Sequence, residues 1–247
     1  MGNMTTLCER LAVVRANIAA ACARANRPPD SVRLIAVSKT HPAETVLEAV
    51  ACGQLEFGEN RIEEAAPKIH EVQSRTTARL TWHMIGHVQS RKARDVIAVV
   101  DIIHSLDSLK LAERYSRFAV ELGRNVPVLL EVNVSGEASK SGFPGANWQT
   151  DPQQRESLWN VIQRIIELPG IHVEGLMTMA PLVDDPEKAR PTFTALRCLR
   201  DALAASFPQA GWGTLSMGMT DDYAVAIEEG ATMVRIGRAI FGERQAM

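Results

Sequence analysis

The sequence predicts an α/β protein whose fold is a single (β/α)8 TIM barrel, in which eight parallel strands alternate with helices. Short apolar or β-branched runs alternate with helical patterns along nearly all of the 247 residues, which is typical of βαβ units on a parallel sheet. Eight strand–helix units fit a chain of this length. Between Val128 and Val134, one face changes from apolar Leu129 to polar Glu131 and Asn133, as expected of a barrel interior that opens into a polar mouth.

An open, doubly wound sheet is the competing architecture. No Gly-x-Gly-x-x-Gly motif follows the first predicted strand, which counts against a dinucleotide-binding sheet of that kind. We find no internal repeat and no interdomain linker, so we expect one domain over residues 1–247. Residues 1–30 of this domain are expected to form an amino-terminal helix and a lead-in to the first strand.

The first predicted element is an amphipathic helix from Thr6 to Ala25. Its apolar positions recur every three or four residues, as a helix with one buried face requires. These positions are Leu7, Leu11, Val14 and Ile18. The segment from Asn26 to Asp30, which contains two prolines, ends the helix.

The remaining elements follow as alternating strands and helices. Strands are expected near residues 33–38, 54–58, 80–85, 100–104, 127–134, 171–177, 213–217 and 232–236. Helices are expected near residues 42–52, 60–74, 89–98, 108–122, 153–167, 187–205 and 221–229, with a short one after Gly237. The longest irregular stretch, Ser135 to Pro152, is either a mobile loop over the barrel mouth or a plain linker.

Composition limits the partners and the compartment. A formal net charge of −2 argues against nucleic acid or an anionic membrane as a partner, and no apolar run is long enough to cross a bilayer. The cysteines have no metal-ligand or CxxC spacing, so we expect packing thiols in a reducing, cytoplasmic environment. They are Cys8, Cys22, Cys52 and Cys198. No histidine–carboxylate spacing suggests a metal site, and His41, His83, His87 and His104 are expected to be structural.

Lys39 is the first residue whose position suggests chemistry. It follows the buried run from Leu34 to Ser38, and Pro42 then begins a helical pattern. A lysine at the carboxyl end of a barrel strand is partly enclosed, and enclosure favours the neutral amine that attacks carbonyl groups. A solvated lysine at the end of a strand is the ordinary structural alternative.

Glycines after the last two predicted strands suggest a phosphate site. Loops at these places in (β/α)8 barrels commonly bind phosphate, and Gly218 and Gly237 allow the backbone to approach an anion. Ser216 and Thr220 offer hydroxyl donors, although this loop is also a plausible turn and helix cap. The alternation of side chains puts Arg235 and Lys39 in the same barrel mouth. A lysine beside a phosphate site suggests pyridoxal 5′-phosphate.

The chain resembles the pyridoxal phosphate homeostasis protein family, whose fold is the amino-terminal barrel of alanine racemase. The resemblance rests on short motifs that occur in order from residue 36 to residue 242. They are Ala36-Val-Ser-Lys-Thr40, Phe57-Gly-Glu-Asn60, Trp82-His-Met-Ile-Gly86 with Gln89-Ser90, Asn133 with Lys140-Ser-Gly142, Gly175-Leu-Met-Thr-Met179, Leu215-Ser-Met-Gly-Met219 with Asp221-Asp222, Val234-Arg-Ile-Gly237 and Ala239-Ile-Phe-Gly242.

The resemblance implies a role for each site residue. Lys39 would form the Schiff base with pyridoxal 5′-phosphate, and Arg235 would face the pyridine nitrogen. The phosphate would be held by Ser216, Gly218, Gly237 and the backbone of Arg238, while Asn60 and Met177 would lie beside the ring. Two positions depart from the family pattern: Arg238 replaces a small hydroxyl residue and Arg91 replaces a small polar residue.

These features predict a carrier of the cofactor more than a catalyst. Arginine keeps its proton, so Arg235 would leave the ring nitrogen unprotonated and the ring a weak electron sink. The racemases that share this fold use a tyrosine from a second domain. We expect no such domain after Met247. Of the two tyrosines, Tyr115 is expected to be a packing residue and Tyr223 lies nearer the mouth.

We therefore expect a cytoplasmic monomer that holds pyridoxal 5′-phosphate on Lys39 and delivers it to pyridoxal-dependent apo-enzymes. Two enzymatic alternatives remain open: a small amino-acid racemase, and a phosphosugar isomerase or aldolase that uses Lys39 on a sugar carbonyl. Lys140, in a glycine-rich loop, is the competing lysine for the cofactor.

Overall fold

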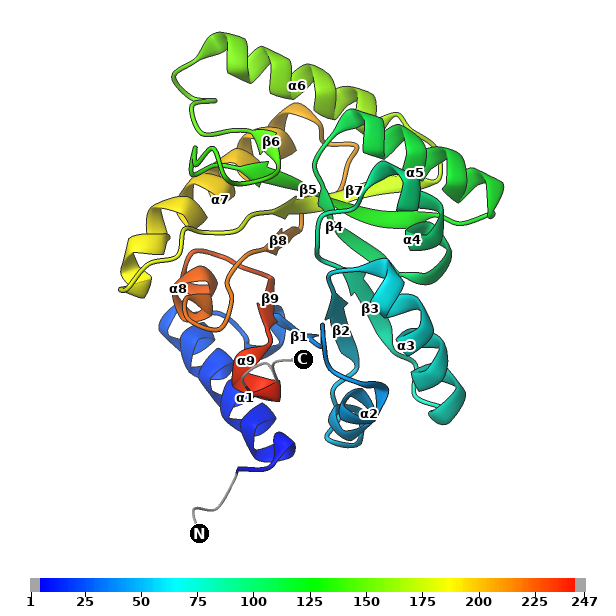
Figure 1. Cartoon of the computed structure of the whole chain (residues 1–247). Coiled ribbons are helices and arrows are strands. Elements are labelled where there is room, and N and C mark those ends of the chain that lie inside the picture. The colour runs from blue at the N-terminus through cyan, green and yellow to red at the C-terminus, as the bar shows by residue number, and fades with distance from the viewer. Residues whose placement is uncertain (1–4, 243–247) are drawn as a thin grey trace.

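Eight parallel strands close into a barrel in the computed structural model, which describes residues 5–242 (Figure 1). The strands are β1 (Arg33–Val37), β2 (Glu56–Glu59), β3 (Thr81–Met84), β4 (Ile102–Leu106), β5 (Val126–Asn133), β7 (Ile171–Met177), β8 (Thr214–Ser216) and β9 (Met233–Ile236). Strands β1 to β5 pair in order, β5 pairs with β7, and the β1–β9 pairing closes the ring. The predicted barrel is confirmed, and the open sheet is excluded.

Helices surround the barrel on the outside (Figure 1). They are α1 (Leu7–Arg24), α2 (Ala43–Ala51), α3 (Ile62–Arg75), α4 (Ala93–Val99), α5 (Leu109–Glu121), α6 (Pro152–Ile166), α7 (Arg190–Ser206), α8 (Tyr223–Glu228) and α9 (Arg238–Phe241). Each corresponds to a predicted helix, with ends that differ by at most a few residues. No helix of the described residues is long and apolar enough to cross a membrane.

Helix α1 packs against α8 and α9 and so covers the place where the chain returns to its first strand (Figure 1). A capping box between Thr6 and Glu9 starts the helix: each side chain bonds the backbone N–H of the other residue. The predicted apolar stripe is buried, because this face lies on the barrel. Arg10 fixes the last helix by donating from Nε to the carbonyl of Ile240 at 2.6 Å.

The expectation that all four cysteines are packing thiols is wrong for two of them. Cys8 and Cys52 form a disulfide with a Cα–Cα distance of 5.3 Å, which joins α1 to the end of α2. The two residues are 44 positions apart, so their spacing gave no sign of the contact that helix packing creates. Cys22 is a buried free thiol and Cys198 a partly exposed one.

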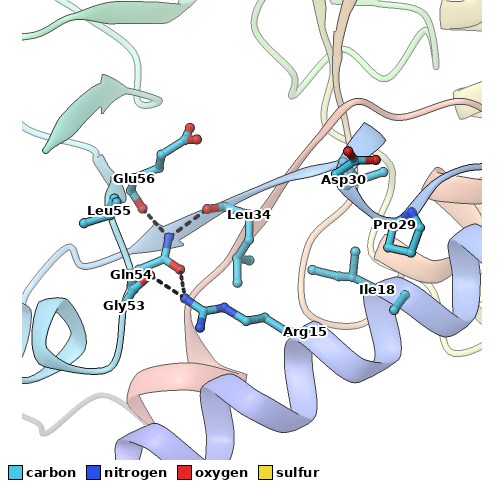
Figure 2. Close-up of a pocket in the computed structure, with 11 residues that line it drawn as sticks. Arg15, Ile18, Pro29, Asp30, Leu34, Gly53, Gln54, Leu55 and Glu56 are labelled. Carbon is cyan, nitrogen blue, oxygen red and sulfur yellow. Dashed lines mark hydrogen bonds between the residues drawn. The ribbon is translucent and has the colours of Figure 1, made fainter.

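The amino ends of β1 and β2 are joined by one buried amide (Figure 2). Gln54 donates from Nε2 to the carbonyls of Leu34 and Glu56, at 2.8 Å each. Arg15 of α1 in turn donates to the carbonyl of Gly53 at 2.8 Å and to Gln54 Oε1 at 3.2 Å. These bonds attach the amino-terminal helix to the end of the barrel opposite Lys39.

The stretch from Ser135 to Pro152, which was predicted to be irregular, includes one short segment of regular structure. It contains a two-residue strand, β6 (Phe143–Pro144), which pairs in parallel with β5 outside the ring. Asn133 orders the start of the stretch, because its Oδ1 accepts the backbone N–H of Gly136 at 3.0 Å. The segment therefore extends the sheet at the carboxyl end of β5.

Candidate functional site at the barrel mouth

Lys39 lies two residues beyond β1, at the carboxyl end of the barrel, and is partly buried. The next residue, Thr40, has a φ of 66°, a conformation that is unusual for a β-branched residue. The Thr40 hydroxyl donates to the carbonyl of Lys39 at 2.5 Å and so helps to hold this turn. Backbone strain of this kind is concentrated at functional positions.

A buried ion pair fixes the backbone on the other side of Lys39. Lys68 of α3 donates to Glu59 Oε1 at 2.8 Å and to the carbonyl of Ser38 at 2.9 Å. The Ser38 hydroxyl donates to the same Glu59 oxygen at 2.7 Å. Since the Lys68 and Glu59 side chains are 9% and 1% exposed, this network holds the end of β1 rigidly.

The two glycines predicted to hold a phosphate lie at the same end of the barrel, on either side of β9. Gly218 has a φ of +93°, and a Cβ there would lie 2.6 Å from Ala226 Cβ. Its carbonyl accepts the backbone N–H of Arg235 at 3.0 Å. Gly237 lies against β1, where a Cβ would be 3.3 Å from the carbonyl oxygen of Val37. Gly237 is therefore packed against the end of β1, and Gly218 lies between β9 and α8.

Arg235 places a buried cation beneath this mouth. The residue is 4% exposed, and it pairs in register with Ile35 of β1, as the predicted strand neighbours require. Its Nη1 donates to Ser216 Oγ at 2.5 Å, and its Nη2 donates to the carbonyl of Thr178 at 3.0 Å. Burial lowers the pKa of Arg235 to about 10, so the guanidinium remains charged at neutral pH.

The loop after β8 is organised by Asp222, which is buried. Asp222 Oδ1 accepts the backbone N–H of Met219 at 2.6 Å, and burial raises the pKa of its carboxyl group. The neighbouring Asp221 forms an ion pair with Arg238 at the exposed rim. The Arg238 side chain is thus engaged with a carboxylate, while its backbone begins α9 directly after Gly237.

A second carboxylate, Glu131, lies inside the barrel near Arg235. Burial raises its pKa to about 7, with a further contribution from Asp107, while Arg235 and His87 act in the opposite direction. In the strand register Glu131 pairs with Met177, which is 1% exposed and pairs with Ser216 on its other side. Glu131 therefore changes its charge near neutral pH within the polar face that the sequence indicated.

Asn60 and Lys140 lie at the rim of the mouth. Asn60 follows β2 and lines a cleft of about 460 Å³ with His87 and Gln89. Its backbone is so close to Gly86 that a Cβ on that glycine would lie 2.4 Å from the Asn60 carbonyl oxygen. Lys140 donates from Nζ to the carbonyls of Met179 and Ala180, so this second lysine closes over the end of β7.

Ser216 lies in the interior of the barrel. Its side chain is fully buried, and its hydroxyl contacts Arg235 Nη1 and His104 Nδ1 rather than the loop that carries Gly218. This contact could not be predicted, because β4 and β8 are not neighbours in the barrel and no spacing in the chain indicates a bond across its interior. The pairing of His104 with His83 was not predicted either, because the alternation gives the order of β3 and β4 but not which of their side chains meet.

The tyrosines are placed as predicted. Tyr115 is 0% exposed within α5, and burial raises the pKa of its hydroxyl. Tyr223 begins α8 next to Gly218, nearer the mouth. Among the described residues, no group of three histidine, cysteine, aspartate or glutamate side chains is arranged to hold a metal ion.

Comparison with known proteins gives a consistent family assignment. The sequence model of the alanine racemase N-terminal domain family matches residues 10–245 of this chain. The pyridoxal phosphate homeostasis protein of Aquifex aeolicus is 41% identical over 96% of this chain and 98% of its own, and that of Escherichia coli is 38% identical over 98% of both.

Solved structures agree with these relatives. PipY of Synechococcus elongatus with pyridoxal phosphate bound has a TM-score of 0.81 at 38% identity and covers 96% of this chain and 100% of its own. Alanine racemase of Clostridium difficile has a TM-score of 0.67 at 14% identity; the match spans 96% of this chain and 58% of the racemase, and it shows the shared fold alone. The chain belongs to the alanine racemase N-terminal domain family and, within it, to the pyridoxal phosphate homeostasis proteins.

Proposed function

We propose that this protein binds pyridoxal 5′-phosphate reversibly through Lys39 and takes part in holding and delivering the cofactor in the cell. The observation that carries the proposal is the meeting of Lys39, Gly218, Gly237 and Arg235 at one end of the barrel. The pyridoxal phosphate bound by PipY, which shares the fold at 38% identity, supports it.

The residues at the mouth fit this cofactor. It supplies an aldehyde, which a lysine amine can join through a covalent C=N bond with the loss of water. The backbone N–H groups of Gly218, Gly237 and Arg238 can receive the phosphate, since backbone N–H groups at turns and helix starts bind anions. Glycine fits the two positions because a side chain would crowd Ala226 and Val37. Asn60 and Met177 would flank the ring.

Ser216 has a different part in this proposal from the one implied by the resemblance. Because its hydroxyl is buried against Arg235, it would act on the guanidinium and not on the phosphate. Arg235 has further N–H groups beyond the two that bind Ser216 and Thr178, and these can donate to the ring nitrogen. A donor that keeps its proton leaves the ring a weak electron sink, which favours carriage of the cofactor over catalysis.

A second candidate function is a small pyridoxal-dependent enzyme that acts on amino acids. The observation that favours it is Glu131, a buried carboxyl group whose pKa of about 7 suits proton transfer at neutral pH. Exchange of the α-proton of amino acids in deuterated water separates the two functions. Sustained exchange in the wild type that is lost in Glu131→Gln supports the enzyme. No sustained exchange in the wild type supports the carrier.

The cellular setting belongs to the same proposal. We expect a cytoplasmic monomer whose partners are the cofactor and pyridoxal-dependent apo-enzymes. Cytosolic proteins rarely keep disulfides, so we expect Cys8 and Cys52 to be mostly reduced there. A phosphosugar isomerase or aldolase on the same barrel is the remaining alternative, and it predicts no pyridoxal chromophore.

Titration of the cofactor-free protein with pyridoxal 5′-phosphate tests the proposal. We expect saturable formation of a yellow chromophore in the wild type and in Lys140→Ala, and its loss in Lys39→Ala. The loaded wild type should then restore the activity of a pyridoxal-dependent apo-enzyme. A chromophore of full affinity in Lys39→Ala would contradict the proposal, as would one that depends on Lys140 alone.

A further inference from the structure

A chain of polar side chains crosses the barrel interior from Arg235 to the amino end of β2. Arg235 Nη1 lies 2.5 Å from Ser216 Oγ, which lies 2.9 Å from His104 Nδ1. The other nitrogen of this ring, His104 Nε2, lies 2.9 Å from His83 Nδ1. Finally, His83 Nε2 lies 3.2 Å from Glu56 Oε2, a close contact that does not have the geometry of a hydrogen bond. We call Ser216, His104, His83 and Glu56 the lumen chain.

The lumen chain is shielded from water over most of its length. Ser216, His104 and His83 are 0% exposed, so each proton must be shared within the chain. Glu56 ends it at the amino side of the barrel, where its side chain is 24% exposed and forms a 2.7 Å ion pair with Arg33. There it lines a cavity of about 440 Å³ beside Gln54 and Leu34 (Figure 2).

The two ends of the chain determine the direction of every bond in it. Arg235 can only donate, and the ionised Glu56 can only accept. The proton of His83 therefore belongs on Nε2, toward Glu56, which leaves Nδ1 as an acceptor for His104. Then His104 carries its proton on Nε2, and its Nδ1 accepts the Ser216 hydroxyl. Ser216 in turn offers a lone pair to Arg235.

The opposite direction is unfavourable. It would turn the lone pair of His83 Nε2 toward the Glu56 carboxylate. It would also make Ser216 accept from both His104 and Arg235, so that neither of these partners could accept the proton of its hydroxyl. Both rings must be neutral for this order to hold. Burial lowers the pKa of His83, and it lowers the pKa of His104 well below its ordinary value.

We propose that His104 and His83 are positioning residues for Arg235, with both ring protons on Nε2. In this state Ser216 is an acceptor toward the guanidinium and fixes the direction in which the remaining Arg235 N–H groups point at the mouth. The inference rests on the proposed function only insofar as Arg235 meets the ring of the cofactor. The arrangement of protons in the lumen chain is a property of the protein itself.

Nitrogen–proton correlation spectra of the histidine rings test the arrangement directly. In the cofactor-free and the loaded protein at pH 7.5, we expect His83 and His104 each to be neutral with a protonated Nε2 and a bare Nδ1. Assignment is by comparison with His83→Gln and His104→Gln. A proton on Nδ1 of either ring, or a doubly protonated ring, would overturn the proposal.

A matched pair of substitutions tests the effect on Arg235. Asparagine and leucine have nearly the same shape, but His104→Asn retains an oxygen that accepts the Ser216 hydroxyl, whereas His104→Leu does not. We expect His104→Leu to weaken cofactor binding about tenfold and to move the nitrogen-15 shift of the labelled cofactor ring. His104→Asn should restore the shift and bind within about threefold of the wild type.

Two controls make the outcome decisive. His70 is exposed, so His70→Leu reports any general effect of losing a histidine. Ser216→Ala replaces His104→Leu if that variant does not fold, and it should move the shift of the cofactor's ring nitrogen in the same way. Unchanged affinity and shift in the folded variants would refute positioning by the chain. If the wild type does not load cofactor on Lys39, the proposed function fails, while the ring spectra still decide whether the lumen chain is ordered as stated.

Discussion

At the scale of single residues, the mouth is built from groups held in unusual states. Thr40 adopts a positive φ beside Lys39, Arg235 is a buried cation, and Glu131 has a pKa of about 7. Each state costs folding free energy, which the surrounding barrel must supply. These residues are therefore where substitutions should separate stability from cofactor binding.

Gly218→Ala tests the glycine that shapes the phosphate loop. Its φ of +93° and the 2.6 Å approach to Ala226 Cβ should make alanine cost about 1–3 kcal/mol in the free energy of unfolding, measured with urea. Gly213→Ala is the matched control, because a Cβ there meets nothing within 4 Å. Equal losses in the two variants would show that Gly218 is not conformationally required.

Glu131→Gln tests how the buried carboxyl group makes the free energy of unfolding depend on pH. The folded protein holds the Glu131 proton up to about pH 7, above the ordinary value of 4.5, so this residue lowers the free energy of unfolding as pH rises through that interval. Glutamine removes the effect, so the variant should gain a few kcal/mol relative to the wild type between pH 5 and pH 8. Exposed Glu48→Gln is the control, and parallel curves for Glu131→Gln and wild type would contradict the assignment.

Residue types at the mouth could be predicted more fully than their contacts. Lys39, Gly218 and Gly237 follow strands whose order in the barrel is dictated by the alternation, and Arg235 lies within the last of these strands, so their convergence follows from the sequence. The bond from Ser216 to His104 does not, because it joins strands on different sides of the ring. Interior contacts of this kind depend on how the barrel closes, which no local pattern encodes.

At the scale of elements, periodicity located the strands and helices, and packing then created contacts that periodicity does not describe. The stripe on α1 predicted which face is buried, whereas the capping box that begins the helix was seen only in the structure. The strand β6 within residues 135–152 and the disulfide from Cys8 to Cys52 were not predicted. Both arise where one element is brought against another that is distant in sequence.

The disulfide between α1 and α2 gives a test at this scale. Because it closes a loop of 44 residues, its reduction should lower the free energy of unfolding by about 2–4 kcal/mol in the wild type. Dithiothreitol should leave Cys8→Ser unaffected, and Cys198→Ser should respond like the wild type. A wild-type transition that does not move with reductant would show that the two sulfurs are not joined in the folded protein.

At the scale of the whole molecule, the barrel interior contains a row of charged and polar groups as well as an apolar core. Its polar groups extend from the Arg33–Glu56 pair at the amino end to Arg235 at the mouth. The barrel closes around them and must desolvate each one. This requirement connects the stability of the fold to the protonation of its interior.

The buried histidines predict the sign of the pH dependence. The pKa values of His83 and His104 are lowered in the folded state, so below the ordinary value of 6.5 the unfolded chain binds more protons. Their contribution to stability is present above that pH and is lost as pH falls from 6.5 toward the lowered pKa values of the folded state. Thermal unfolding should show a shallower slope over this range in His104→Asn, whereas exposed His70→Asn should keep the wild-type slope; identical slopes would contradict the burial of neutral rings.

The most direct test of the account is the identity of the lysine that holds the cofactor. The protein, loaded with pyridoxal 5′-phosphate, is reduced with borohydride, digested and mapped by mass spectrometry. The account predicts a pyridoxyl group on Lys39, in the peptide that contains Ser38 and Thr40. A modification confined to Lys140, or no stable modification at any lysine, would contradict it.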